Sequence, residues 1–254
     1  MDPLIVPIAD VSVVTMDFLT AQSGGSLLQT LTLYLFFAGT VAMGAGALYF
    51  FLLRNDVAPE YRSTMVVAGL VCAIACFHYY KMTGVYQSGQ GFPTALRYVD
   101  WLFTTPLLLM KFPLLLRMGD RGTKFFWQLV VLDVAMIVTA FIAETSVVDS
   151  QRWWTFFIVS CVFELMIVGV LFVSLGQAIK DAPAPLAKAL ETMRLFVLIG
   201  WAIYPIGFLM ARAGAGEYRE IIYNVADVIN KVGFGLVAYH GIKAMSHRER
   251  YAGS

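Results

Sequence analysis

Charged side chains are scarce in this 254-residue chain. Asp, Glu, Lys and Arg make up 14% of it, whereas about 25% is usual for a soluble domain. Hydrophobic residues make up 59%, which leaves too little polar surface to cover a water-soluble fold. The net charge of +1 lacks the basic excess that nucleic-acid binding requires. The composition therefore predicts a protein of the lipid bilayer.

Cysteine and histidine are rare as well, with three residues of each. Cys72, Cys76 and Cys161 all lie in apolar runs, and no histidine or acid forms a metal-ligand set with them. We interpret the cysteines as packing residues and expect no metal site.

The N-terminal stretch MDPLIVPIADVSVVTMDFLTAQSGG has no basic leader and contains Asp2, Asp10 and Asp17. These features argue against a signal peptide. We expect residues 1–26 to form an extracellular, interfacial segment ahead of the first membrane span.

Apolar runs of about 20 residues or more recur along the chain, and each is long enough to cross a hydrocarbon core of about 30 Å. They lie near residues 27–53, 63–86, 95–116, 125–147, 153–177, 187–212 and 217–244. The connections are short, and QSGQGFP between the second and third runs suits an ordered turn or hairpin. The sequence predicts an all-α membrane protein, a seven-transmembrane-helix bundle over residues 27–244 with a cytoplasmic tail at 245–254.

The distribution of Lys and Arg predicts the orientation, because cytoplasmic connections carry the excess of basic residues. One set of connections holds Arg54, Arg62, Arg117, Arg121, Lys124, Lys180, Lys188, Lys243, Arg248 and Arg250. The other set holds Lys81, Arg152, Arg212 and Arg219, together with Glu144, Asp149, Glu217 and Glu220. We expect the first set inside the cell, the N-terminus outside and the C-terminus inside.

Several ionisable residues interrupt the apolar runs, and such groups are expensive at bilayer depth. They are His78, Arg97, Asp100, Lys111, Asp133, Glu164, Asp227 and Lys231. Asp227 and Lys231 lie at i and i+4 on one face of the seventh run, and Arg97 and Asp100 repeat the pattern at i and i+3 on the third. A structural ion pair is the alternative interpretation of Asp227 and Lys231, but two acids and two bases facing one interior favour a functional site.

Asp100 and Lys111 flank the run WLFTTPLLLMKF. At about 100° per residue they return to within about 20° of one helix face, roughly 16 Å apart along the axis. Two ionisable groups on one face of the helix indicate a path along which a charged species moves. A buried lysine such as Lys231 is also the usual site of a Schiff base, and a protonated Schiff base needs a carboxylate nearby.

Three separate motifs, RYVDWLFTTPLLL, WAIYP (201–205) and DVINKVGFG, resemble the third, sixth and seventh helices of the microbial rhodopsins. The likeness covers all seven runs and is strongest to the proteorhodopsin-like proton pumps. Within these it favours the subgroup exemplified by Exiguobacterium rhodopsin, in which lysine replaces the cytoplasmic carboxylate. VAPEYRS (57–63) and RLFVLIGWAIYPIG (194–207) carry that closer likeness.

The resemblance implies a role for each matched residue. Lys231 would carry all-trans retinal as a protonated Schiff base, and Lys111 would be the proton donor. Asp100 would be the primary counterion and proton acceptor, Asp227 the second counterion and Arg97 the gate toward the outside. Thr104 would hydrogen-bond Asp100, and His78 would pair with that acid, although a lone histidine on an apolar helix is more often a core residue.

The same resemblance implies a retinal pocket in which aromatic rings confine a flat polyene. Its residues would be Trp101, Thr104, Thr105, Leu108, Asp133, Met136, Phe157, Ser160, Trp201, Tyr204, Pro205 and Asn230. Leucine at 108 goes with green absorption, and Asp133 would be a neutral, structural partner of Thr105. Glu164 departs from the pattern, because that branch usually has a tryptophan there near the retinal ring.

We therefore expect a light-driven outward proton pump of the cell (inner) membrane, a transporter and not an enzyme, assembled as a pentamer or hexamer. Lys111 would rest largely neutral and relay a proton from the cytoplasm. A retinal-based photosensor that signals through a partner is the alternative, although the tail SHRERYAGS is too short for a signalling domain. A transporter or receptor without retinal would leave Lys231, Asp227 and Asp100 unexplained.

Overall fold

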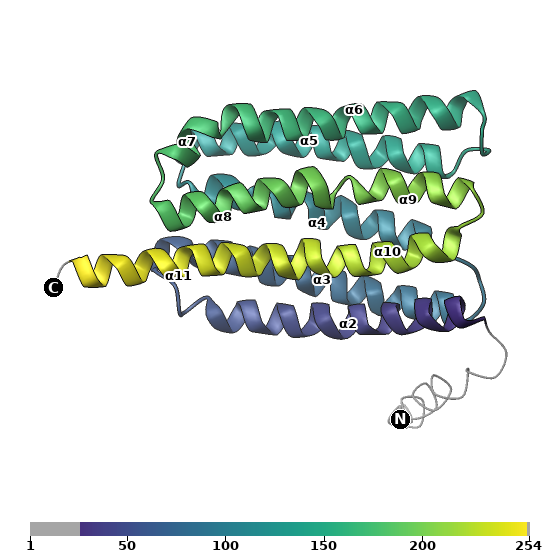
Figure 1. Ribbon diagram of the computed structural model, residues 1–254, viewed down its shortest axis with the longest axis horizontal. Coiled ribbons are helices and arrows are strands. Elements are labelled where there is room, and N and C mark those ends of the chain that lie inside the picture. Colours follow the sequence, from purple (N-terminus) through teal and green to yellow (C-terminus); the bar gives the residue numbers. More distant parts are fainter. Residues whose placement is uncertain (1–25, 253–254) are drawn as a thin grey trace, which may run out of the picture.

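Seven rods lie side by side along the long axis of the molecule in the computed structural model, which describes residues 26–252 (Figure 1). Five are single helices: α2 (Leu27–Leu53), α3 (Arg62–Gln87), α4 (Thr94–Leu115), α5 (Gly119–Glu144) and α6 (Gln151–Ser174). The sixth rod comprises α8 (Ala184–Leu195), the π-helical turn η3 (Phe196–Gly200) and α9 (Ile203–Arg212). The seventh comprises α10 (Gly216–Val228), the π-helical turn η4 (Ile229–Gly233) and α11 (Phe234–Ala252). Two short helices, η2 (Pro59–Tyr61) and α7 (Gly176–Lys180), lie in connections.

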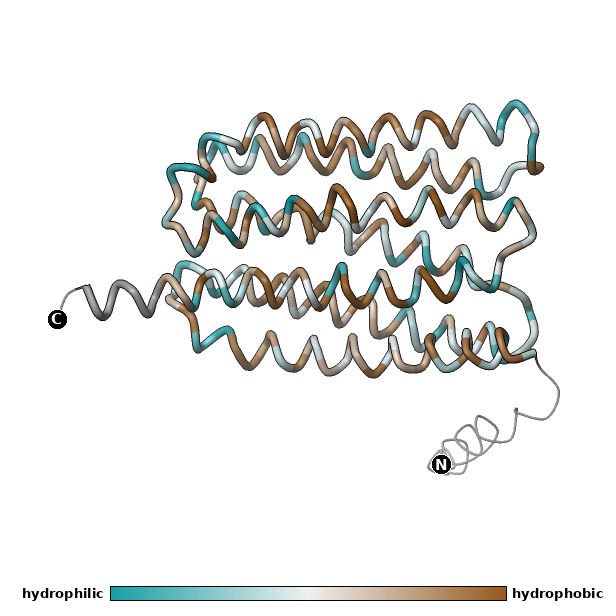
Figure 2. Tube along the Cα trace, viewed as in Figure 1, coloured by the Kyte–Doolittle hydropathy of each residue, from teal (hydrophilic) through white to brown (hydrophobic). Residues whose placement is uncertain are grey.

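Six of these rods are long and apolar enough to cross a membrane. The exception is α4, which has 22 residues but contains Arg97, Asp100 and Lys111 as well as two prolines. At 1.5 Å per residue it is still about 33 Å long, enough for a hydrocarbon core. Figure 2 shows hydrophobic residues along the rods and hydrophilic ones concentrated in the connections at both ends. The prediction of a seven-helix membrane bundle is therefore confirmed.

Local chemistry accounts for several of the helix ends. Ser26 caps α2 through a capping box with Gln29, and the Ser150 side chain accepts from the Trp153 amide at the start of α6. The connection QSGQGFP forms turns in which Gly89 and Gly91 have positive φ, a conformation that glycine adopts without strain. It is an ordered turn and not a hairpin, because residues 26–252 contain no strand.

The predicted bounds were wrong where charged residues begin or continue a helix. The fourth span begins at Gly119 and not near residue 125, because RGTK continues the helix at a membrane end where water can solvate its charges. The last helix runs to Ala252, so most of the predicted tail is helical. The N-terminal segment lies outside the described residues except for Ser26.

Two rods change their winding at the level where they meet the polar interior. Proline at 205 has no amide to donate, and the chain widens into η3 and then turns at Trp201 before α9 begins. The seventh rod widens at η4, which contains Lys231. Such π-turns are frequent at functional sites.

Candidate functional site

Lys231 lies in the middle of the bundle with only 2% of its side chain exposed. Its Nζ is 3.0 Å from Asp100 Oδ2 of α4 and 3.1 Å from Asp227 Oδ1, one turn earlier on its own rod. Both carboxylates are fully buried. The predicted i, i+4 arrangement of Asp227 and Lys231 is therefore confirmed as a contact, and α4 supplies the second acid.

The two carboxylates have different surroundings. Asp227 accepts hydrogen bonds from Tyr79 Oη at 2.8 Å, Trp101 Nε1 at 3.2 Å and Tyr204 Oη at 2.6 Å. Neither oxygen of Asp100 has a hydrogen-bond partner of good geometry, although Lys231 lies close to it. A carboxylate that accepts several donors is stabilised as the anion. Asp100 is therefore the acid of the pair that is better suited to take up a proton.

Arg97 is 2% exposed and connects Asp227 to a third acid, Glu220. Its Nη1 lies 3.4 Å from Asp227 Oδ2, and its Nη2 donates to Glu220 Oε2 at 2.7 Å and to Asn224 Oδ1 at 2.8 Å. Arg97 and Asp100 are three residues apart on α4, but the ion pairs of Arg97 are with Asp227 and Glu220. Arg97 faces α10, where Glu220 and Asn224 lie on the same stripe as Asp227.

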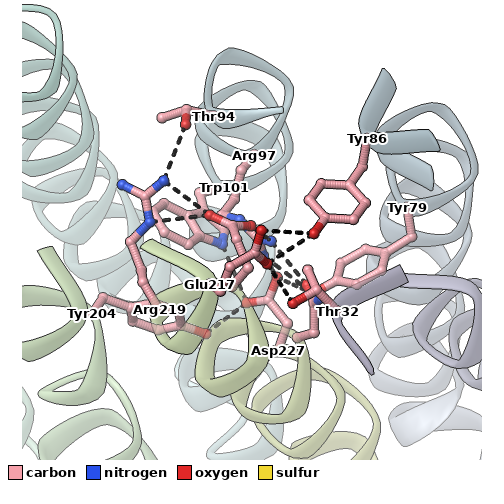
Figure 3. Close-up of polar contacts among 12 residues, drawn as sticks. Thr32, Tyr79, Tyr86, Thr94, Arg97, Trp101, Tyr204, Glu217, Arg219 and Asp227 are labelled. Atoms are coloured by element: carbon pink, nitrogen blue, oxygen red, sulfur yellow. Dashed lines mark hydrogen bonds and ion pairs between the residues drawn. The ribbon is translucent and has the colours of Figure 1, made fainter. Parts of the chain in front are cut away.

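Arg219 and Glu220 were assigned to a connection by the sequence analysis, but both are buried within α10. Arg219 binds Glu220 at 3.0 Å and Glu144 at 2.8 Å. One turn earlier, Glu217 accepts from Thr32 at 2.7 Å and from Tyr86 at 2.8 Å, which ties α10 to α2 and α3 (Figure 3). A polar chain therefore runs from Lys231 to the end of the bundle at which α2 begins.

His78 lies next to Asp100, with 3.6 Å between Nδ1 and Oδ1. The same nitrogen is 2.9 Å from the backbone oxygen of Ile74. Thr104 was expected to hydrogen-bond the Asp100 carboxyl, but its hydroxyl donates to the Asp100 backbone oxygen at 2.8 Å. That bond to the preceding turn is the usual one for a threonine inside a helix.

Beyond Lys231 an apolar pocket crosses the bundle toward α5 and α6. Ten of the twelve residues predicted to form it line its walls: Trp101, Thr105, Leu108, Met136, Phe157, Ser160, Trp201, Tyr204, Pro205 and Asn230. Thr104 and Asp133 do not. The Thr104 hydroxyl instead donates to the Asp100 backbone oxygen. Asp133 lies behind the pocket wall, where it accepts a hydrogen bond from Thr105 at 2.7 Å, as predicted.

The sequence analysis missed several residues of the site. Tyr98, Ile137, Ala140, Cys161, Phe208 and Tyr223 line the pocket as well, and Tyr79, Glu220 and Asn224 belong to the charged network. A spacing signal existed for Glu220, which precedes Asp227 by two helical turns and so shares its face. The positions of the other missed residues depend on packing between helices, which spacing along one helix does not predict.

Lys111 lies on α4 at the other side of Lys231, fully buried. Its Nζ has no hydrogen-bond partner among the described residues and lies 4.9 Å from the centre of the Phe234 ring. Thr64 of α3 is a second buried residue whose hydroxyl has no hydrogen-bond partner in this part of the structure. Among the described residues, Lys111 is thus outside the hydrogen-bonded network that surrounds Arg97.

Residues 30–245 match the family model of bacteriorhodopsin-like proteins. Green-light absorbing proteorhodopsin from a gamma-proteobacterium is 33% identical over 211 residues, which cover 81% of this chain and 84% of that protein. Bacteriorhodopsin of Halobacterium salinarum is 34% identical over 213 residues, or 78% of this chain and 79% of that protein. The crystal structure of Exiguobacterium sibiricum rhodopsin superposes with a TM-score of 0.79 at 46% identity, covering 85% of this chain and 98% of the other. Xanthorhodopsin, described as a light-driven ion pump with dual chromophore, gives 0.81 at 30% identity, covering 87% and 96%. The chain belongs to the bacteriorhodopsin-like family.

Proposed function

We propose that this protein is a light-driven outward proton pump whose chromophore is all-trans retinal attached to Lys231. One observation carries the proposal: among the described residues, Lys231 is the one lysine that lines the pocket, and it lies between two buried carboxylates. When bound as a protonated Schiff base, retinal supplies a light-driven isomerisation that moves a proton donor relative to those carboxylates.

The residues present fit such a group. The pocket is predominantly apolar, as small-molecule sites usually are, and aromatic rings from α4, α6, α9 and α10 form much of its wall. Buried Asp100 oxygens without a hydrogen-bond donor suit a cationic nitrogen next to them, because an unpaired buried charge is costly.

Asp100 would accept the proton, and Asp227 would remain the fixed anion. The three hydrogen bonds to Asp227 stabilise its charge, whereas Asp100 has only Lys231 and His78 nearby. Proton transfer to Asp100 neutralises its carboxylate. Asp100 would then no longer attract the positive charge of neighbouring groups such as His78.

Arg97 would separate Asp100 from the outside. It fills the interior between Asp227 and Glu220, so a proton passing outward has to pass its guanidinium. This role requires the end with Glu217 to face outward, as the distribution of Lys and Arg favours. The N-terminus would then be outside and the C-terminus in the cytoplasm.

Lys111 would return a proton from the cytoplasm to the Schiff base. Its amine has no carboxylate partner within the described residues, and a buried ammonium without a partner costs several kcal/mol. Lys111 would therefore rest neutral and carry a proton only in passing. An assembly of five or six subunits remains part of the proposal.

Light-dependent acidification of the medium tests the function. Cells that express the protein with added retinal should acidify an unbuffered medium in light, and a protonophore should abolish the change. Cells expressing Lys231→Ala should show no response. A coloured protein that produces no light-dependent pH change would contradict the pump and favour the photosensor.

A further inference from the structure

Glu164 is the one carboxylate among the residues that line the pocket. It lies on α6, whereas Lys231 lies on the rod of α10 and α11. Figure 1 shows that α6 and that rod are on opposite sides of α8 and α9. The carboxyl group is partly buried and forms no hydrogen bond or ion pair with other described residues. The pump mechanism described above does not use it.

The position of Glu164 matters because the counterions lie at the opposite end of the pocket. Asp100 and Asp227 are both within about 3 Å of Lys231. Excitation of a conjugated iminium moves positive charge from the nitrogen toward the far end of the polyene. A negative charge at the nitrogen therefore raises the excitation energy, and a negative charge at the far end lowers it, by Coulomb's law.

We infer that Glu164, in addition to Leu108, tunes the colour of the chromophore. It would act as a titratable group on the pocket wall opposite Lys231. The inference rests on the proposed attachment of retinal to Lys231. A protonated Glu164 leaves the far end neutral, whereas an ionised Glu164 moves the absorption to longer wavelength.

The sign of the shift separates Glu164 from the counterion. Protonation of Asp100 on acidification removes a negative charge at the nitrogen and shifts the colour to the red. Ionisation of Glu164 also shifts the colour to the red, but it occurs as the pH rises. Loss of the proton from Lys231's imine would remove the visible band altogether.

Other ionisable groups on the surrounding elements have to be distinguished from Glu164. They are Tyr98 of α4, Asp133 of α5, Cys161 of α6, Arg194 of α8 over Phe172, Tyr204 of α9, and Tyr223 and Lys231 of the seventh rod. Asp133 is the closest chemical analogue, because it is the other acid without a basic partner in this half of the bundle.

The experiment records visible spectra of the purified pigment from mildly acidic to mildly alkaline pH. The wild type should show a red shift on the order of 10 nm as the pH rises. Glu164→Gln should abolish that shift, and Glu164→Asp should retain a weaker one. Glu164→Leu serves if the glutamine variant forms no pigment. Asp133→Asn should retain the pH-dependent shift, and Glu191→Gln, which changes an exposed acid of α8, should behave as the wild type.

Infrared difference spectra give a second readout that does not depend on pumping. A carboxylic C=O band should disappear over the same pH range in the wild type and be absent from Glu164→Gln. The inference is overturned if Glu164→Gln keeps the shift, if Asp133→Asn loses it, or if the wild type shows none. If retinal forms no pigment with the wild type, the proposed function fails instead.

Discussion

Replacing Lys111 by methionine tests the relay mechanism most directly, because methionine keeps most of the length of the side chain and removes the amine. Lys111 Nζ is fully buried, lacks a hydrogen-bond partner in the described residues and lies 4.9 Å from the centre of the Phe234 ring. The substitution changes the one feature that a proton relay needs.

The magnitudes indicate which charge state rests in the protein. Desolvation of an ammonium costs several kcal/mol, whereas a desolvated cation–π contact returns about 2 kcal/mol or more. We therefore predict that the neutral amine is the resting form. Its removal leaves no broken ion pair, so Lys111→Met should keep the thermal stability of the pigment or raise it by about 1 kcal/mol.

Although Lys111→Met should not lower the stability of the pigment, it should slow reprotonation of the Schiff base. Loss of a positioned acid–base group typically costs a factor of about 10² to 10⁴, so reprotonation of the Schiff base should slow by that order in Lys111→Met and Lys111→Ala. Colour and proton transfer to Asp100 should be unchanged. A small diffusible acid such as azide should restore part of the rate. Lys188→Met, on an exposed position of α8, is the matched control and should behave as the wild type.

Flash spectroscopy with a pH-sensitive dye measures both events in one experiment. In the wild type, proton uptake and reprotonation should share one time constant, and both should slow as the pH rises because a neutral amine has to capture a proton first. Reprotonation that clearly precedes uptake would show a lysine loaded in advance and would refute the reasoning.

Three further substitutions test the rest of the site. Lys231→Ala should give a colourless protein in the presence of retinal, and a stable visible pigment would contradict the attachment. His78→Asn should move the pH midpoint of the acid red shift upward, because it removes an imidazole 3.6 Å from Asp100 that can carry a positive charge; an unmoved midpoint would show that the two groups are not coupled. Glu220→Gln should lower pigment stability by about 3 kcal/mol, measured by thermal bleaching, because Arg97 loses its 2.7 Å ionic partner; an unchanged bleaching temperature would refute the importance of that pair.

Exposed residues of the same types supply the controls. Lys81→Ala and His240→Asn change side chains that are exposed and should leave colour and its pH midpoint unchanged. Asp149→Asn breaks the exposed pair with Arg212, and solvent screening should make its effect on bleaching small.

The fold was predictable because a hydrocarbon environment requires long, continuous apolar sequence. The same signal fails at the ends of the spans. Gly119 to Lys124 are polar or charged, yet they form the first turns of α5, because charges at a membrane end remain solvated. The break at Trp201 was also hidden, since a missing amide at Pro205 allows several local windings and the packing selects one.

The candidate site likewise contains residues that spacing along one helix predicts and contacts that it does not predict. Asp227 and Lys231 were predictable because one helical turn brings them together whatever surrounds the helix. The partner of Arg97 was not, because its contact with Glu220 depends on the rotation of α4 against α10. Spacing on α4 suggested Asp100 instead, three residues away on the same helix. Local periodicity thus locates a buried charge but does not identify its partner on another helix.

Most of the buried ionisable side chains pair with one another, whereas Lys111 does not. Arg97, Arg219 and Lys231 form ion pairs with Asp100, Asp227 and Glu220, but Lys111 has no carboxylate partner among the described residues. Transfer of a proton from the Lys231 side to Asp100 would remove one charge of each sign. A permanently charged Lys111 would be a buried cation without an ionic partner, at a cost of several kcal/mol. We therefore predict that Lys111 rests neutral and that it holds a proton only until the Schiff base takes it.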